Sequence, residues 1–298
     1  MLENQFHKEG VAWNADASIP KVVYRTVPSI LAMPQSISKT FHDLILANKN
    51  WQQIVFDDVL QEEYILSHCT QRVIDSYFQL NPAYGPARAD LFRYLIVYQN
   101  GGVYLDQKSG VVSSLDLMIS PSDQYLLAPV DITGKKHSPH KQLRPWSGVE
   151  YMQWLIASVP GHPFLAAVIT RVLRNIERYR PLLFGVGKKG VLNVTGPIAY
   201  TCAIAPIAGQ FPHRLIDAHL QGWRYTMLES TTAHFNFSNI HYSRLSTPIV
   251  QINTNAILVR KLWILVETLI ARFIGKLSVI NHDRLQLRRE KRGCRKLN

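Results

Sequence analysis

The sequence predicts an α/β fold in which a mostly parallel sheet is flanked by helices. Three observations support this prediction. Short runs of β-branched and aromatic residues alternate with longer segments of helical periodicity. A glycine pair separates one such helix from the strand-like run that follows it. The chain has 298 residues, of which 47% are hydrophobic, and this is enough for one large domain with a buried core.

The predicted elements follow one another along most of the chain. Strands are expected where apolar and β-branched residues cluster, and helices where apolar residues recur every three or four positions. The predicted order is a strand over 20–26, a helix capped by Ser36 that runs through Phe41, Leu44 and Ile45, a strand over 53–58, helices around 58–67 and 70–79, a helix and a strand within 87–106, a strand over 124–128, a polar loop over 131–145, a helix from Pro163 to about Tyr179 and a helix that begins at Pro197.

The helix predicted within 87–106 carries an unusual set of polar residues. Asp90, Arg93 and Tyr94 have the spacing i, i+3 and i+4, so an acid, a base and a phenol share one face. Taken alone, Asp90 and Arg93 could form an ordinary ion pair on a helix surface. The segment that follows them favours a functional interpretation.

That segment is predicted to bring a carboxylate to the end of a strand. Gly101 and Gly102 permit positive φ and therefore a tight exit from the helix. Residues 103–105 favour a β conformation and lead directly to Asp106. Open α/β sheets bind ligands at the carboxyl ends of their strands, so Asp106 is a candidate site residue.

These motifs resemble the family of glycosyltransferases named for a sugar-binding region with a DXD motif, which includes a yeast outer-chain mannosyltransferase and is similar to the glucosylating domain of large clostridial toxins. The family signature is an Ala-x-Asp-x-x-Arg helix followed by Gly-Gly-x-Tyr-x-Asp-x-Asp. The matching residues are Ala87 or Ala89, Asp90, Arg93, Gly101, Gly102, Tyr104 and Asp106. The last aspartate of the signature is replaced by Lys108.

Three further blocks occur in the order typical of the family, at 19–21 (Ile-Pro-Lys), 162–163 (His-Pro) and 195–197 (Thr-Gly-Pro). The resemblance therefore spans roughly residues 19–250. It implies a GT-A-like fold with a Rossmann-like mixed sheet. It also implies transfer of a hexosyl unit from a UDP- or GDP-sugar to a glycan acceptor, with retention at the anomeric carbon, in polysaccharide or glycolipid synthesis. A lipid-linked or capsular glycan acceptor is expected only from the membrane-seeking C-terminal segment described below.

The resemblance also assigns roles to residues. It implies that Asp106 binds Mn²⁺ or Mg²⁺, and that Asp90 and Arg93 hold the donor sugar or its ribose, so these three are the expected catalytic residues. His241 is the preferred second metal ligand among four candidates in a later loop, the others being His234, Asn236 and Asn239. The residues expected to bind substrate are Tyr24, Arg88, Asp90, Arg93, Gly101, Gly102, Tyr104, Lys108, Thr195 and Gly196.

Lys108 leaves the metal requirement open, because an ammonium cannot bind a metal ion and repels one nearby. Lys108 could point away from the ion. It could instead contact the diphosphate itself, which would make the metal dispensable. In a third alternative the motif is degenerate, and the protein is a non-catalytic sugar-binding relative.

The C-terminal segment, residues 251–298, differs from the predicted glycosyltransferase domain, residues 1–250. It holds 11 of the 33 Lys and Arg residues but only 3 of the 21 Asp and Glu residues, which gives +8 of the total charge of +12. Residues 257–280 have helical periodicity, with an apolar face that contains Trp263 and a face rich in cations. This pattern is typical of a helix lying on an anionic membrane surface, although packing on the domain or on a second copy is an alternative.

The expected location is cytoplasmic, at the inner face of the membrane. The N-terminus shows no apolar run that would mark a signal sequence or an anchor. The three cysteines, Cys69, Cys202 and Cys294, are far apart and lack metal-ligand spacing, which indicates a reducing compartment. The basic tail could also bind nucleic acid, but no recognition motif supports that function.

Overall fold

The computed structural model of the protein describes residues 5–131, 140–228, 245–251, 262 and 264–270. Its central feature is a six-stranded sheet with the strand order β2-β1-β3-β6-β5-β7. A separate two-stranded sheet pairs β4 with β8. The strands are β1 (Val22–Thr26), β2 (Gln52–Phe56), β3 (Gly102–Leu105), β4 (Gly110–Val111), β5 (Tyr125–Leu127), β6 (Leu155–Ser158), β7 (Arg214–Leu215) and β8 (Trp223–Arg224).

The main sheet is mixed. Strand β1 runs parallel to both β2 and β3, whereas β6 is antiparallel to its neighbours β3 and β5. The expectation of a mostly parallel sheet missed β6, because the chain reaches it from β5 without the α-helical crossover that a parallel neighbour needs. The predicted α/β architecture, a mixed sheet with flanking helices, is confirmed.

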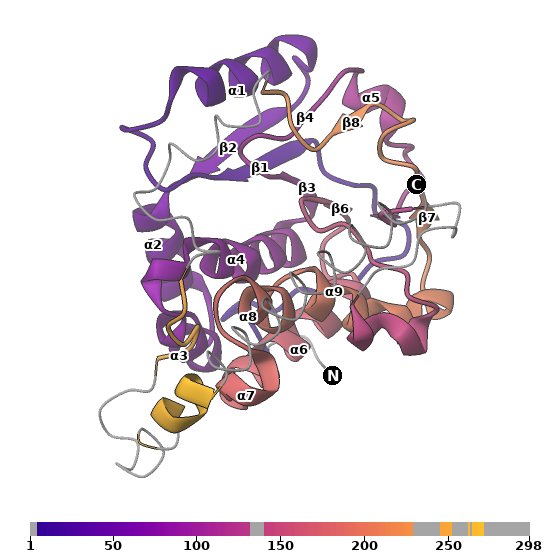
Figure 1. The fold of residues 1–298 in the computed structure, drawn as a ribbon. Helices are drawn as coiled ribbons and strands as arrows, with labels where there is room; N and C mark the ends of the chain where they lie inside the picture. Colours follow the sequence, from indigo (N-terminus) through magenta and orange to yellow (C-terminus); the bar gives the residue numbers. More distant parts are fainter. Residues whose placement is uncertain (1–4, 132–139, 229–244, 252–261, 263, 271–298) are drawn as a thin grey trace, which may run out of the picture.

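Helices cover both faces of the sheet (Figure 1), with α1 and α5 on one face and α4, α6, α8 and α9 on the other. The α-helices are α1 (Gln35–Ala47), α2 (Asp58–His68), α3 (Gln71–Gln79), α4 (Gly85–Asn100), α5 (Leu115–Met118), α6 (Pro163–Glu177), α7 (Pro181–Phe184), α8 (Gly187–Val194) and α9 (Pro197–Ile204). Three 3₁₀ helices, η1 (Pro82–Tyr84), η2 (Lys141–Trp146) and η3 (Ala205–Gln210), complete the described elements.

Two apolar clusters hold these layers together. Alternate residues of each strand point to opposite faces, so Val23 and Val103 pack toward the α1 side while Tyr24 and Tyr104 pack toward α4. Helix α4 is buried along most of its length because it lies between the sheet and α6. Close packing on both sides of α4 holds its polar residues, Asp90 and Arg93, in a fixed position at the strand ends.

Three local expectations need correction. The N-cap of α1 is Pro34, and Ser36 lies within the helix, where its hydroxyl has no capping role. Strand β2 ends at Phe56 because Asp57 caps α2 instead, accepting a hydrogen bond of 3.0 Å from the backbone N–H of Leu60. The region predicted as a loop over 131–145 contains most of η2 in its described part.

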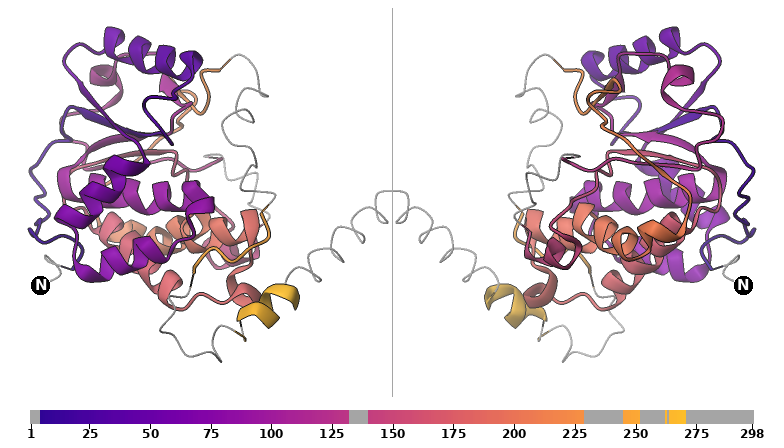
Figure 2. Two further views of the ribbon diagram at one scale, coloured as in Figure 1. Left: turned by 90° about the vertical axis from the view of Figure 1, so that its left-hand side faces the viewer. Right: turned by 90° about the vertical axis from the view of Figure 1, so that its right-hand side faces the viewer.

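Most of the predicted C-terminal helix lies outside the described residues. Residues 264–270 are helical and lie at the edge of the helical layer (Figure 2). Glu267 is buried and forms an ion pair with Arg180, and Ile264 and Thr268 are also buried. The division of the chain near residue 250 stays a prediction.

Residues Gly187–Gln210 are long and apolar enough to cross a membrane by length and composition. However, 61% of its most apolar window is buried inside the fold, and a core helix of a folded domain has the same property. No other described helix meets these criteria.

Candidate active site

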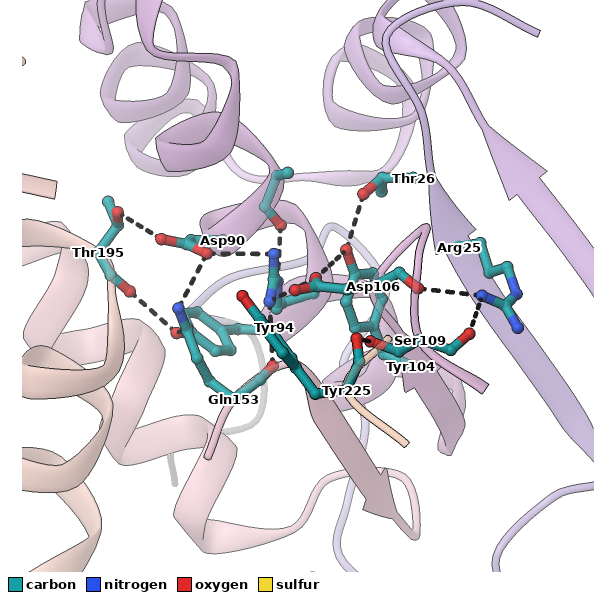
Figure 3. A network of polar contacts seen from close by, with 12 residues as sticks. Arg25, Thr26, Asp90, Tyr94, Tyr104, Asp106, Ser109, Gln153, Thr195 and Tyr225 are labelled. Atoms are coloured by element: carbon teal, nitrogen blue, oxygen red, sulfur yellow. Dashed lines mark hydrogen bonds and ion pairs between the residues drawn. The ribbon is translucent and has the colours of Figure 1, made fainter. Parts of the chain in front are cut away.

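The candidate active site forms where the polar face of α4 meets the end of β3. Arg93 links the two carboxylates labelled in Figure 3, because its guanidinium lies 3.2 Å from a carboxylate oxygen of Asp90 and 3.0 Å from one of Asp106. The helical spacing of Asp90 and Arg93 predicted the first contact. The second depends on the tight turn that returns the chain from α4 into the sheet.

Gly101 and Gly102 make that turn, with φ values of 67° and 95°. A Cβ atom on Gly101 would lie 2.7 Å from Cδ of Pro160, and one on Gly102 would lie 2.6 Å from Cγ1 of Val22. Only glycine can therefore follow this path between its neighbours. These contacts are with packed side chains and backbone, so the structure gives the glycine pair a role in chain geometry.

Asp90 is held on three sides by polar groups. Its carboxylate accepts hydrogen bonds from the Thr195 hydroxyl at 2.9 Å and from the Gln153 amide at 3.1 Å, in addition to its contact with Arg93. Burial raises the pKa of Asp90 to about 6, and Arg93 opposes that rise. The carboxyl group is fixed in position by these contacts and is nearly inaccessible to solvent.

Arg93 remains charged in this setting. Burial disfavours its charge, but Asp106, Tyr104 and Asp90 outweigh burial and raise the pKa of Arg93 above its ordinary value. The guanidinium also lies over the Tyr104 ring, 4.5 Å from the centroid, and donates to the backbone carbonyl of Gln153 at 3.0 Å. These contacts account for its fixed orientation.

Asp106 is the more accessible of the two carboxylates. Its side chain is 25% exposed, against 4% for Asp90. Its backbone N–H donates to the carbonyl of Trp154 at 3.0 Å, which extends the pairing of β3 with β6 by one residue. The hydroxyl of Tyr104, itself hydrogen-bonded to Thr26, lies 3.4 Å from the Asp106 carboxylate. Ligands can therefore approach the cluster from the Asp106 side.

The loop after Asp106 is fastened to two other parts of the chain. The buried Arg25 on β1 donates to the carbonyls of Asp106 at 3.0 Å and Ser109 at 2.9 Å. On the other side, the Ser109 hydroxyl donates to the carbonyl of Tyr225 at 2.9 Å, next to β8. The Lys108 ammonium lies 3.9 Å from the centroid of the Tyr225 ring.

The structure does not bring all of the predicted residues together. Asp90, Arg93, Tyr104, Asp106 and Thr195 form one connected network. The other predicted residues within the described part lie apart from that network or have structural contacts: Tyr24 packs in the core beside Phe56, Arg88 pairs with Glu62 at 2.6 Å, and Gly196 is the N-cap of α9, where a Cβ would meet Leu192. The candidate metal ligand His241 lies outside the described residues, as do His234, Asn236 and Asn239.

Several residues of the network could not be assigned from the sequence. Gln153, which hydrogen-bonds Asp90, Arg93 and Tyr94, precedes β6, and only the antiparallel pairing of that strand brings it here. Tyr225 likewise reaches the site only through a long-range strand pairing, that of β8 with β4. Arg25 gave no signal beyond being a charged residue in a predicted strand, where a buried arginine is rare.

The described residues fit a divalent cation poorly. Such ions prefer several oxygen ligands, mostly carboxylates. Among the residues that the structure describes, no three His, Cys, Asp or Glu side chains gather into a candidate metal site. Asp106 is already paired with Arg93, and the position that carries the second carboxylate in the DXD signature is occupied by Lys108.

The comparisons with known proteins agree with the signature. Residues 34–126 match the family model described as "Glycosyltransferase sugar-binding region containing DXD motif". An initiation-specific alpha-1,6-mannosyltransferase of Schizosaccharomyces pombe is 24% identical over 199 residues, which are 63% of this chain and 48% of that protein. Inositol phosphoceramide mannosyltransferase 3 of the same species is 26% identical over 171 residues, 56% of this chain and 39% of that protein.

This chain thus spans half or less of the length of these relatives. A solved structure, the PaToxG glycosyltransferase, aligns with a TM-score of 0.42 and 14% identity over 64% of this chain and 69% of that chain. The region matched by the family model contains α4, β3 and the Asp90–Arg93–Asp106 cluster. Residues 34–126 therefore match the glycosyltransferase sugar-binding region that contains the DXD motif, in agreement with the signature residues.

Proposed function

We propose that the protein transfers a hexosyl unit from a nucleoside diphosphate sugar to a glycan acceptor. The observation that carries this proposal is the Asp90–Arg93–Asp106 cluster, which lies within the matched region and opens to solvent at Asp106. The mannosyltransferases among its relatives favour mannose as the transferred hexose. The donor base, UDP or GDP, follows from neither observation and is left to experiment.

The reaction exchanges one bond for another. An acceptor hydroxyl oxygen forms a bond to the anomeric carbon, while the bond from that carbon to the diphosphate breaks and its electron pair goes to the diphosphate. The hydroxyl proton departs with the nucleoside diphosphate. Retention at the anomeric carbon is part of the proposal and rests on the family resemblance. The new charge on the leaving diphosphate must be stabilised by fixed cations or by a metal ion.

The residues of the cluster have distinct roles in this proposal. Asp106 accepts hydrogen bonds from hydroxyl groups of the donor sugar. Arg93 keeps the two carboxylates at a fixed separation and prevents their mutual repulsion. Asp90, Thr195 and Gln153 orient Arg93. Preorganised charge of this kind is the main source of rate acceleration in many enzymes.

The proposal is tested by incubating the full chain with UDP-glucose, UDP-galactose and GDP-mannose and measuring the release of UDP or GDP. A sugar acceptor such as a mannoside is supplied, and water serves as the default acceptor. We expect one donor to be consumed with acceptor-dependent kinetics. If one donor binds but none is consumed, the protein is the non-catalytic sugar-binding relative instead.

We further propose that the protein works at the cytoplasmic face of an anionic membrane, where a lipid-linked or capsular glycan acceptor would be found. Supporting this, the part of the C-terminal helix that the structure describes turns polar Glu267 toward the domain and leaves apolar side chains exposed: Leu262, Leu265, Val266, Leu269 and Ile270. Leu182 and Leu183, just beyond Arg180, are exposed as well. The surrounding segment, 251–298, carries a charge of +8.

Flotation with vesicles tests this location. The wild-type chain is expected to float with vesicles that contain phosphatidylserine, and the double variant Leu265→Glu with Leu269→Glu is expected to stay in solution. Leu31→Glu is the matched control, because Leu31 is 99% exposed and precedes α1, which covers the opposite face of the sheet from α6, α8 and α9. Equal flotation of all three proteins, or of none, would contradict the proposal.

A further inference from the structure

Lys108 changes the charge of the site by the amount that a divalent cation supplies. The DXD signature has an aspartate at this position, so replacing it with lysine raises the local charge by two units. Asp90 and Asp106 together are nearly balanced by Arg93 and Lys108. A signature with two aspartates carries a net negative charge here and must add a cation before a diphosphate can bind. This chain carries the compensating charge on its own residues.

Within the part of the chain that the structure describes, no carboxylate pairs with the Lys108 ammonium. Among the described residues Lys108 forms no ion pair, whereas Arg93 has two carboxylate partners. The ammonium lies 3.9 Å from the centroid of the Tyr225 ring, which is half exposed and packs edge-on against Trp154. A cation–π contact at an exposed ring is weaker than a charge-assisted hydrogen bond to phosphate. The lysine is therefore held near the site without being neutralised.

The backbone around Lys108 is fixed on both sides. The carbonyl of Lys108 accepts a hydrogen bond of 2.8 Å from the N–H of Met227, and the next residue, Ser109, is bound by Arg25 and by the carbonyl of Tyr225. Gly110 then pairs with Arg224. With its backbone held, Lys108 can change only its side-chain conformation. The ammonium can therefore swing from the Tyr225 ring to an anion bound beside Asp106 while the loop stays in place.

We propose that Lys108 binds the diphosphate of the donor directly and takes the place of the divalent cation, so that donor binding by this chain does not require a metal. The proposal rests on the proposed function, since it concerns the donor of that same reaction. In the free protein a cation–π contact with the Tyr225 ring holds the Lys108 ammonium beside the site. In the complex Lys108 contacts the diphosphate as a point charge, and Tyr225 is released to contact the donor or the acceptor.

The test is calorimetric titration of the full chain with UDP and GDP and with their sugars, in EDTA and then in Mn²⁺. The variants are Lys108→Ala, Lys108→Asp and, as the control, Lys39→Ala, which removes an exposed lysine of α1. We expect the wild type and Lys39→Ala to bind one nucleotide in EDTA, with less than a threefold change in Mn²⁺. Lys108→Ala should bind at least tenfold more weakly in EDTA, and Lys108→Asp should bind only when Mn²⁺ is present.

Each outcome separates this proposal from the one on which it rests. Wild-type binding that appears only with Mn²⁺, or an unchanged affinity of Lys108→Ala in EDTA, overturns the role of Lys108 and leaves the glycosyltransferase function standing. A wild-type chain that binds no nucleoside diphosphate or its sugar under either condition overturns the proposed function. Lys108 is partly exposed and its side chain forms no hydrogen bond within the described residues, so the variants are expected to fold, which a thermal melt verifies.

Discussion

At the centre of the candidate active site one guanidinium is shared between two carboxylates of unequal exposure. Asp90 is buried on α4 and has three polar partners, while Asp106 at the end of β3 remains accessible. This difference in exposure gives the two carboxylates different roles: Asp90 orients Arg93, and Asp106 can contact a ligand. It follows from position alone, since one carboxylate lies within the helical layer and the other at the end of a strand.

The buried carboxyl group makes stability depend on pH in a specific way. The pKa of Asp90 rises from 3.8 to about 6 on folding, so between these values the folded state holds a proton that the unfolded state has lost. The contribution of Asp90 to stability therefore falls as pH increases through this window and is constant above it. The melting temperature of the wild type minus that of Asp90→Asn, measured from pH 4 to pH 7.5, should decrease. A difference that increases with pH would mean that Arg93 dominates and lowers the pKa.

The turn between α4 and β3 connects residue geometry to element geometry, and it is sensitive to a single methyl group. Gly102→Ala would place Cβ 2.6 Å from Val22 at a φ of 95°, so we expect a loss of about 2 kcal/mol or more in unfolding free energy. Gly209→Ala is the matched control, because no atom lies within 4 Å of its added Cβ. Urea denaturation compares the two, and equal stability of the two variants would refute the structural role of Gly102.

At the scale of elements, β1 supports the loop that carries Asp106. Arg25→Met removes the two hydrogen bonds from β1 to the carbonyls of Asp106 and Ser109 and leaves the part-buried Asp106 carbonyl and the buried Ser109 carbonyl without this donor. We expect a cost of about 2–4 kcal/mol in unfolding free energy together with weaker donor binding. Arg72→Ala, which breaks an exposed pair with Glu177, should cost less than about 1 kcal/mol. Full stability of Arg25→Met would show that the loop is held in another way.

The elements were predictable to different degrees for physical reasons. Helix α6 begins at Pro163 as predicted, and α4 and β3 match closely, because local periodicity and helix-breaking residues determine them. The pairings of β6 with β3 and of β4 with β8 join segments far apart in the sequence, so no local sequence pattern predicted them. For this reason the sequence revealed Asp90, Arg93 and Asp106, whereas Gln153 and Tyr225 emerged only from the strand pairings that deliver them.

For the molecule as a whole, two features set the expected behaviour. The described domain presents one open carboxylate at a strand end, and its C-terminal helix presents apolar side chains outward while Glu267 fastens it to Arg180. Both features are required by our proposal that the protein transfers a sugar to an acceptor at a membrane surface. The ion pair between Glu267 and Arg180 joins the segment after residue 250 to the domain before it, across the predicted boundary.

The most direct single measurement is the rate of nucleoside diphosphate release from the preferred donor by the wild type and by Asp106→Asn. The substitution keeps the size of the side chain and removes the accessible charge at the strand end. We predict a loss of roughly a hundredfold or more in turnover, while circular dichroism shows a folded protein and Lys39→Ala retains wild-type activity. Undiminished turnover by Asp106→Asn would contradict the assignment of the active site to this cluster.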